Sequence, residues 1–332
     1  MKFHNLIVLV FSISLFSSCF PEDDMVTPHV PGNEITVELG SNIYNKMQYF
    51  DCSSNQIVQE YDNNAWQLGF ETAEDGWHIL LNSASNIYIR KTGINVFDDV
   101  NNVPDGFDWI YDNPDGNPDS TAIDKWVITN SSDTNYTNEV YLLGFFDGIS
   151  YSVYKKINFT FVNESRYEFR SANLDGSNEV LHEVLKDTMY QYMFYNIIGE
   201  HGIVDQPLKT DWDILFSQYL ITLYDNDGTP TPYSVRGVLL NPFGVKVAVD
   251  SVMTFTDITL NDIVYLDYSN EINVIGHEWK YYSGVESGTY VTNTDVNYFI
   301  LDFSGYYYKL RFISYYNTAG SVGYPVFEYQ QL

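Results

Sequence analysis

The two halves of this chain repeat one another at an offset of 146 residues. Residues 39–70 align with residues 185–216 without a gap, and eight of the 32 positions are identical. The identical residues are mostly bulky or aromatic: Leu39/Leu185, Tyr44/Tyr190, Met47/Met193, Tyr49/Tyr195, Ile57/Ile203, Val58/Val204, Trp66/Trp212 and Phe70/Phe216. Two copies of about 150 residues are too few and too long for a solenoid, so the repeat predicts two tandem globular domains with one fold.

The match continues downstream with changes in loop length. Leu80-Leu81-Asn82 corresponds to Leu239-Leu240-Asn241, Trp126 to Trp279, and Tyr167-Glu168-Phe169 to Phe327-Glu328-Tyr329. Every part of the first half therefore has a counterpart in the second. We expect one domain over residues 34–175 and a second over residues 178–332.

The hydrophobic pattern within each half has a period of two. Apolar residues alternate with polar ones, as in the series Ile157, Phe159, Phe161 and the series Tyr308, Leu310, Phe312. This alternation is typical of strands with one buried face, and Asp-Gly and Ser-Gly pairs mark turns between them. The one helix candidate, residues 179–186, aligns with a segment that reads as a strand. The predicted fold class is all-β, with antiparallel sheets.

The first residues are typical of an export signal. An apolar run from Leu6 to Leu15 follows Lys2, and it is too short to cross a bilayer core of about 30 Å. The sequence Leu15-Phe16-Ser17-Ser18-Cys19 resembles a bacterial lipobox, in which the cysteine becomes the lipid-modified N-terminus. We therefore expect a signal peptide over 1–18 and a lipidated tether over 19–33, with ordinary secretion as the alternative. The acidic residues that follow Cys19 resemble export tags of some outer-membrane lipoproteins, which predicts an outer-membrane, surface-exposed location.

Composition excludes several classes of function. The net charge is −28, from 16 basic and 44 acidic residues, and it repels nucleic acid and anionic lipid, so the lipid anchor is the only expected contact with a membrane. No nucleophile elbow, zinc-protease helix, P-loop or dinucleotide motif occurs, so we expect no enzyme activity and no catalytic residues. Cys52 aligns with Ile198, which predicts a buried apolar role.

Several segments together resemble the HmuY family of haem-binding outer-membrane lipoproteins. In the second half these segments are 212–216, 237–241, Trp279, 308–312 and 323–329, and a weaker version runs through the first half. The resemblance implies an all-β fold in which a cleft between two projecting lobes grips haem and passes it to a TonB-dependent outer-membrane receptor. An alternative is an interaction module on the same fold, which contacts a protein or a glycan and holds no iron.

The axial ligands of the family are missing at their usual places. The resemblance implies one histidine within 110–125 and another within 280–290, and neither segment contains histidine or methionine, so that ligand pair is excluded. Haem iron also accepts other His, Met or Tyr side chains. The first candidate is His277, two residues before Trp279, and the second is Met253. For His277 the ordinary alternative is a histidine in a routine hydrogen bond.

Other candidate residues have structural interpretations. His182 aligns with Thr36, which predicts a solvated strand face, and Met47 and Met193 align with each other, which favours core packing. The loop 112–119 is rich in Asp and Asn, which are calcium ligands and also ordinary turn residues. Calcium could order this loop, but its spacing does not fit the helix-loop-helix calcium motif, so no metal site is predicted.

Overall fold

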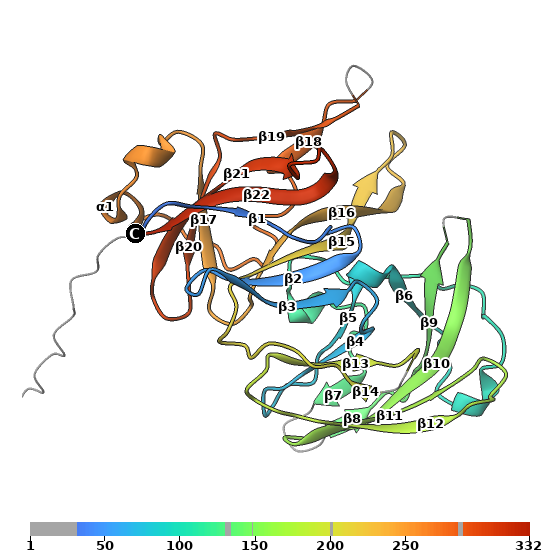
Figure 1. Cartoon of the computed structure of the whole chain (residues 1–332). Coiled ribbons are helices and arrows are strands. Elements are labelled where there is room, and N and C mark those ends of the chain that lie inside the picture. The colour runs from blue at the N-terminus through green and yellow to red at the C-terminus, as the bar shows by residue number, and fades with distance from the viewer. Residues whose placement is uncertain (1–31, 130–133, 148, 200–201, 285–287) are drawn as a thin grey trace, which may run out of the picture. The chain divides into compact units, whose positions relative to one another are not determined.

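Antiparallel β-sheets account for nearly all the regular structure. The computed structural model describes residues 32–129, 134–147, 149–199, 202–284 and 288–332 (Figure 1). Within these residues one α-helix is present, the four-residue α1 (Leu260–Ile263), besides four short 3₁₀ turns at Ser83–Ser85, Phe97–Asp99, Pro118–Ser120 and Phe255–Asp257. The prediction of an all-β antiparallel fold is confirmed, and residues 179–186 contain a strand.

A five-stranded and a four-stranded sheet form from one continuous stretch of chain. The five-stranded sheet has the order β12 (Val180–Leu185), β11 (Arg166–Ala172), β10 (Tyr151–Val162), β9 (Val140–Phe146), β6 (Ile87–Lys91). The four-stranded sheet has the order β14 (Gly202–Ile203), β13 (Tyr192–Asn196), β4 (Leu68–Glu71), β5 (Ile79–Leu81). We call these two sheets, residues 68–203, the contiguous unit.

A second pair of sheets combines the beginning and the end of the described chain. One has the order β1 (Ile35–Glu38), β22 (Val322–Gln331), β21 (Tyr307–Tyr316), β20 (Asn297–Leu301), β17 (Lys246–Asp250). The other has the order β16 (Pro230–Leu240), β15 (Ile214–Tyr224), β2 (Lys46–Asp51), β3 (Gln56–Asp62). We call these sheets, residues 35–62 and 214–331, the split unit; Figure 1 shows its first strands in blue beside the red and yellow strands of the C-terminal half.

Two hairpins complete the strands, one in each unit. They are β7 (Val127–Thr129) with β8 (Thr134–Tyr136), and β18 (Lys280–Tyr282) with β19 (Tyr290–Thr292). At the 146-residue offset, β1 to β4 correspond to β12 to β15, and the order of strands is the same in the two units. The sheets therefore cross the boundary expected between residues 175 and 178, because β12 pairs with β11 and β13 pairs with β4, while β14 joins the same sheet through β13.

Each unit has its own core between its two sheets. In the split unit, Phe50 from β2 packs with Phe216, Trp279 and Phe312. In the contiguous unit the corresponding cluster includes Phe70, Trp126, Phe159 and both Met193 and Tyr195 from β13. Side chains on alternate positions of each strand thus fill the space between paired sheets, as a sandwich requires.

Buried polar contacts recur at equivalent places in the two units. The Asn82 side chain donates from Nδ2 to the backbone oxygen of Trp66 at 2.8 Å, and Asn241 donates in the same way to Trp212 at 2.7 Å. A buried amide in this position satisfies a carbonyl that would otherwise lose its hydrogen bond to water.

Two buried lysines also correspond. Lys156 Nζ donates to the backbone oxygen of Phe97 at 3.1 Å, and Lys309 Nζ donates to that of Phe255 at 2.7 Å. In both cases the ammonium group lies 4.7 Å from the centroid of the same phenylalanine ring. Lys309 lies between Tyr308 and Leu310 in the alternating series, where the sequence pattern predicts a solvated side chain. The pattern therefore could not predict that Lys309 is buried.

The expectation for His182 is wrong. Its side chain is buried, lies at 2.8 Å from Ser171 Oγ and 2.9 Å from Tyr195 OH, and stacks on the Phe169 ring with a centroid distance of 4.3 Å. The sequence alignment with Thr36 misled because it is one residue out of register at this strand: His182 pairs with Phe169, whose counterpart Tyr329 pairs with Ile35. The predictions for Cys52, Met47 and Met193 are confirmed, since all three are buried.

All described strand pairs and hydrogen bonds lie within residues 32–332. This segment forms one compact unit by its backbone contacts. It therefore contains every described contact of the fold, and a chain that starts at Gly32 keeps them all. The expected signal peptide, Cys19 and most of the tether lie outside the described residues.

Candidate functional site

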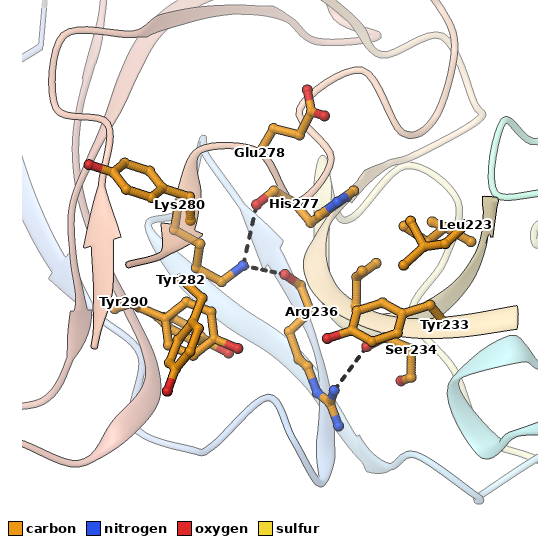
Figure 2. Close-up of a pocket in the computed structure, with 13 residues that line it drawn as sticks. Leu223, Tyr233, Ser234, Arg236, His277, Glu278, Lys280, Tyr282 and Tyr290 are labelled. Carbon is orange, nitrogen blue, oxygen red and sulfur yellow. Dashed lines mark hydrogen bonds between the residues drawn. The ribbon is translucent and has the colours of Figure 1, made fainter. Parts of the chain in front are cut away.

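A cavity lies in the split unit, between two projecting hairpins. Its volume is about 440 Å³. One wall comes from β15 and β16 beyond the sandwich, the other from the β18–β19 hairpin and the segment before it (Figures 1 and 2). Five tyrosines line it: Tyr233, Tyr281, Tyr282, Tyr290 and Tyr315. We call this cavity the hairpin cleft.

The long β15–β16 hairpin has no counterpart in the contiguous unit. Strands β15 and β16 have 11 residues each and pair along their whole length, whereas β4 and β5 have four and three. The extension begins after the residues that match in the repeat, and its turn is the Asp-Asn-Asp-Gly sequence that marks a hairpin. The cleft therefore occurs where the two halves differ.

His277 lines the hairpin cleft. It follows Gly276, whose φ of 62° and backbone hydrogen bonds with Val238 tie this segment to β16. The imidazole ring lies edge-on to Tyr219, with a centroid distance of 6.3 Å. Burial, and then the nearby Lys280, lower the pKa of His277, so the ring is neutral at pH 7. A neutral imidazole is the form that ligates a metal.

Met253 lies elsewhere and does not line the hairpin cleft. Its side chain packs against the apolar cluster of Ala248, Ile258 and Phe299, close to α1. Its backbone N–H donates to Asp250 at 2.7 Å, and its backbone oxygen accepts from Asn297 at 2.8 Å. The structure thus brings His277 to a cavity and leaves Met253 in a separate apolar contact.

Lys280 is a cleft residue that the sequence interpretation missed. The residue is only 7% exposed, and its Nζ donates to the backbone oxygens of Arg236 and His277 (Figure 2). Burial, and then the charge of Arg236, lower the pKa of Lys280 to about 7. One signal was present in the repeat, because Trp279-Lys280 aligns with Trp126-Val127. The lysine replaces a valine directly after a core tryptophan, and this difference between the two halves could have marked Lys280 as a candidate site residue.

Arg236 stands beside it on β16. The guanidinium carbon lies 4.2 Å from the ring centroid of Tyr44, and Nη1 donates to the backbone oxygen of Ser234 at 3.1 Å. Its Nε is buried and has no hydrogen-bond partner among the described residues. Within the described ranges, neither Arg236 nor Lys280 forms an ion pair with a carboxylate.

A second cavity lies where the two units meet. Its volume is about 160 Å³, and its walls are mainly apolar, with Trp66, Trp212, Tyr49 and Phe194 among them. The Trp66 and Phe194 rings stack at 4.1 Å. This space is too small for a large planar ligand, and its lining packs strands of the two units against each other.

The acidic loop 112–119 is held by its own hydrogen bonds. Asp112 is buried, and its two carboxylate oxygens accept from the backbone N–H groups of Leu81 at 2.6 Å and Ala122 at 2.7 Å. Burial raises the pKa of Asp112 to about 7. Across the described residues, no group of three or more His, Cys, Asp or Glu side chains has an arrangement that could hold a metal ion. The buried carboxylate of Asp112 therefore ties this loop to β5.

Cys52 is buried, and burial raises the pKa of its thiol. Its backbone N–H donates to Asp213 at 2.8 Å. A protonated, enclosed thiol is a poor nucleophile, so this residue acts in packing.

Among the helices that the structure describes, none has both the length and the apolar character needed to cross a membrane.

Comparison with known proteins gives one family. A family model described as HmuY protein matches residues 43–329. No curated protein matches the chain. The crystal structure of apo PinO from Porphyromonas gingivitis is similar over 90% of this chain and 97% of that chain, at 9% identity and a TM-score of 0.29. The apo HmuY analogue from Tannerella forsythia is similar over 90% and 95%, at 10% identity and a TM-score of 0.25. The assignment to a family depends on the family model, which spans most of the chain.

Proposed function

Because this chain belongs to the HmuY family, we propose that it is a surface-exposed lipoprotein that binds haem, or a related flat hydrophobic ligand, in the hairpin cleft. Delivery of this ligand to a TonB-dependent outer-membrane receptor would follow from the same family role. The function is binding and needs no catalytic group.

The observation that carries the proposal is the composition and place of the hairpin cleft. A volume of about 440 Å³ lies within the range of about 300–1,000 Å³ that is usual for ligand pockets. Its tyrosines supply flat apolar faces with polar edges, which suit a planar aromatic ligand. Two projecting hairpins on either side of the cleft also agree with the two-lobed grip that the family resemblance implies.

His277 is the residue we propose to hold the iron of a bound haem. It supplies an imidazole nitrogen at the wall of the cleft, and its lowered pKa keeps that ring neutral and able to donate a lone pair. When bound, the haem iron would supply a coordination position for this ring. Met253 is not proposed as a partner ligand, because it packs in a different cluster.

The test is a haemin titration of residues 32–332, followed by its Soret band. We expect a sharp, saturable band with the parent chain and its loss or marked shift with His277→Ala. His78→Gln is the matched control, because His78 is paired with Glu71 outside the cleft and its change should leave the band intact. A band that is unaltered in His277→Ala would rule out this ligand, and no band with any chain would favour the interaction module.

We also propose that the two units arose by tandem duplication. The support is the shared order of strands together with matched buried contacts, such as Asn82 on Trp66 and Asn241 on Trp212. The split unit would then have gained the extension of the β15–β16 hairpin, or the contiguous unit would have lost it. In either case only the split unit would hold the ligand site. The contiguous unit would serve mainly as a scaffold.

A further inference from the structure

Basic side chains are scarce in this chain. Lysine and arginine number 16 against 44 acidic residues. The residues in described ion pairs include Lys46, Lys91, Arg166, Arg170 and Arg311. Two basic residues that line one cavity and form no ion pair among the described residues are therefore notable in so acidic a chain.

Arg236 and Lys280 form that pair. Both line the hairpin cleft, Lys280 is 7% exposed, and the Nε atom of Arg236 is buried without a partner among the described residues. A buried charge is unfavourable unless it is paired, and repulsion from the charge of Arg236 adds to that cost by lowering the pKa of Lys280. An anion that enters the cleft would relieve both costs.

The fold does not require these cations. The repeat aligns residues 80–82 with residues 239–241, so Arg236 corresponds to 236 − 159 = 77, which is Trp77. Trp126 aligns with Trp279, so Lys280 corresponds to 280 − 153 = 127, which is Val127. The contiguous unit builds the same sheets with apolar residues at both positions.

Other charged groups at the cleft leave room for an anion. Glu278 also lines the cavity, and Figure 2 shows its carboxylate directed away from Lys280 Nζ and from the Arg236 guanidinium. The remaining walls are largely tyrosine faces. A ligand with a carboxylate and a flat aromatic ring could therefore place the carboxylate near the two basic residues and the ring against the tyrosines.

We propose that Arg236 and Lys280 together bind a carboxylate of the ligand, so that the hairpin cleft selects flat aromatic acids over their uncharged analogues. This inference rests on the proposed function only for the place of binding, and not on iron. Arg236 offers a planar guanidinium that matches the geometry of a carboxylate, and Lys280 offers a point charge from the opposite wall.

The experiment compares two fluorescent probes of one shape. Residues 32–332 are titrated with 1-pyrenebutyrate and with its methyl ester, which lacks the negative charge. We expect the acid to bind about tenfold more tightly than the ester, a typical effect of one charge-assisted contact. Arg236→Gln and Lys280→Met should each remove most of that preference. Lys246→Met, an exposed lysine of β17, is the control and should keep the preference.

Equal binding of acid and ester by the parent chain would overturn the inference, and so would an equal loss of both probes in the two variants when circular dichroism shows an intact fold. A separate haemin titration distinguishes the two proposals. A preference for the acid without a haemin Soret band would leave the acid site standing and sink the haem proposal. A Soret band without any preference for the acid would do the reverse.

Discussion

The side-chain nitrogen of Lys280 lies 4.2 Å from the ring centroid of Trp279, the largest side chain in the core of the split unit. Cation–π attraction of this kind stabilises by about 0.5–2 kcal/mol. Removing an ammonium group from water costs more, which is why burial lowers the pKa of Lys280 to about 7. The core thus contains an amine that is half neutral near neutral pH.

Lys280→Met should change how stability depends on pH. In the parent chain the unfolded lysine binds a proton up to about pH 10.5, whereas the folded one releases it above about pH 7. The free energy of unfolding should therefore rise by about 1.4 kcal/mol per pH unit between these values, relative to Lys280→Met. Urea unfolding at pH 7, 8 and 9 measures this difference. Parallel curves for the two chains would contradict the lowered pKa.

Binding of an aromatic acid should weaken as the pH rises through 7. Protonated Lys280 attracts the carboxylate, and the protonated fraction falls above its pKa of about 7. The other groups facing it are Arg236, His277, Glu278, Tyr290 and Tyr315; burial raises the pKa of both tyrosines, that of Tyr290 to about 12. We expect the affinity for 1-pyrenebutyrate to fall severalfold, within the roughly tenfold per pH unit that one proton allows, from pH 6 to pH 8. If the affinity of Lys280→Met does not change with pH, the pH dependence of the parent chain comes from Lys280. The same pH dependence in both chains would refute this.

Asn82→Ala and Asn241→Ala should destabilise the protein by similar amounts. Each amide donates to two backbone oxygens, and the second acceptor is Asn63 for Asn82 and Lys209 for Asn241. Removing the amide leaves buried carbonyls unpaired, so we expect a loss of about 2–4 kcal/mol in each case. Chemical denaturation measures it. Asn64→Ala, an exposed neighbour, is the control and should change stability by less than about 0.5 kcal/mol.

A chain of residues 63–206 should fold by itself, although it matches neither half of the repeat. It contains every strand of the contiguous unit, from β4 to β14. A chain of residues 34–175 should fail, because β11 and β4 lose β12 and β13 as partners and β2 loses β15. Circular dichroism during thermal unfolding distinguishes them: we expect a cooperative transition for the first chain and none for the second. The opposite result would mean that the sequence repeat, and not the sheets, sets the folding units.

Cys19→Ala should release the protein from the membrane. The full chain, expressed in a Gram-negative host, should partition into the detergent phase of Triton X-114, and the variant into the aqueous phase, because lipid on Cys19 is the proposed anchor. Ser18→Thr is the matched control. Detergent partition of Cys19→Ala would contradict lipid attachment at this residue.

The sequence was sufficient for the class of fold and for the family. Alternation along residues 157–161 and 308–312 predicted strands that the structure contains. Trp279 and several short segments between residues 212 and 329 carried the family resemblance. Periodicity reports which face of a strand is buried, but it does not report which strand lies beside it. The spacing of apolar residues could not predict that β2 pairs with β15 and β13 with β4, because the same spacing is compatible with a partner strand from the same half of the sequence.

The site was only partly predictable. His277 was found because it precedes the tryptophan that anchors the family pattern, and the structure does place it on the cleft. Lys280 and Arg236 were overlooked, since a basic residue in a strand normally points to water. Met253 was chosen by its place in the sequence alone, and only three-dimensional packing separates it from the cleft.

The pairing of Ile35 with Tyr329 joins the first described strand to the last. During synthesis and export, β1, β2 and β3 leave the secretion channel early, yet their partners β15 and β22 follow only after the whole contiguous unit has emerged. The contiguous unit can close first, while β1 and the β2–β3 hairpin wait with unpaired edges. Periplasmic chaperones that shield such strands would therefore have their greatest effect on the N-terminal residues. A ribosome that stalls before β22 would leave a product whose contiguous unit is folded and whose split unit, which holds the ligand cleft, is incomplete.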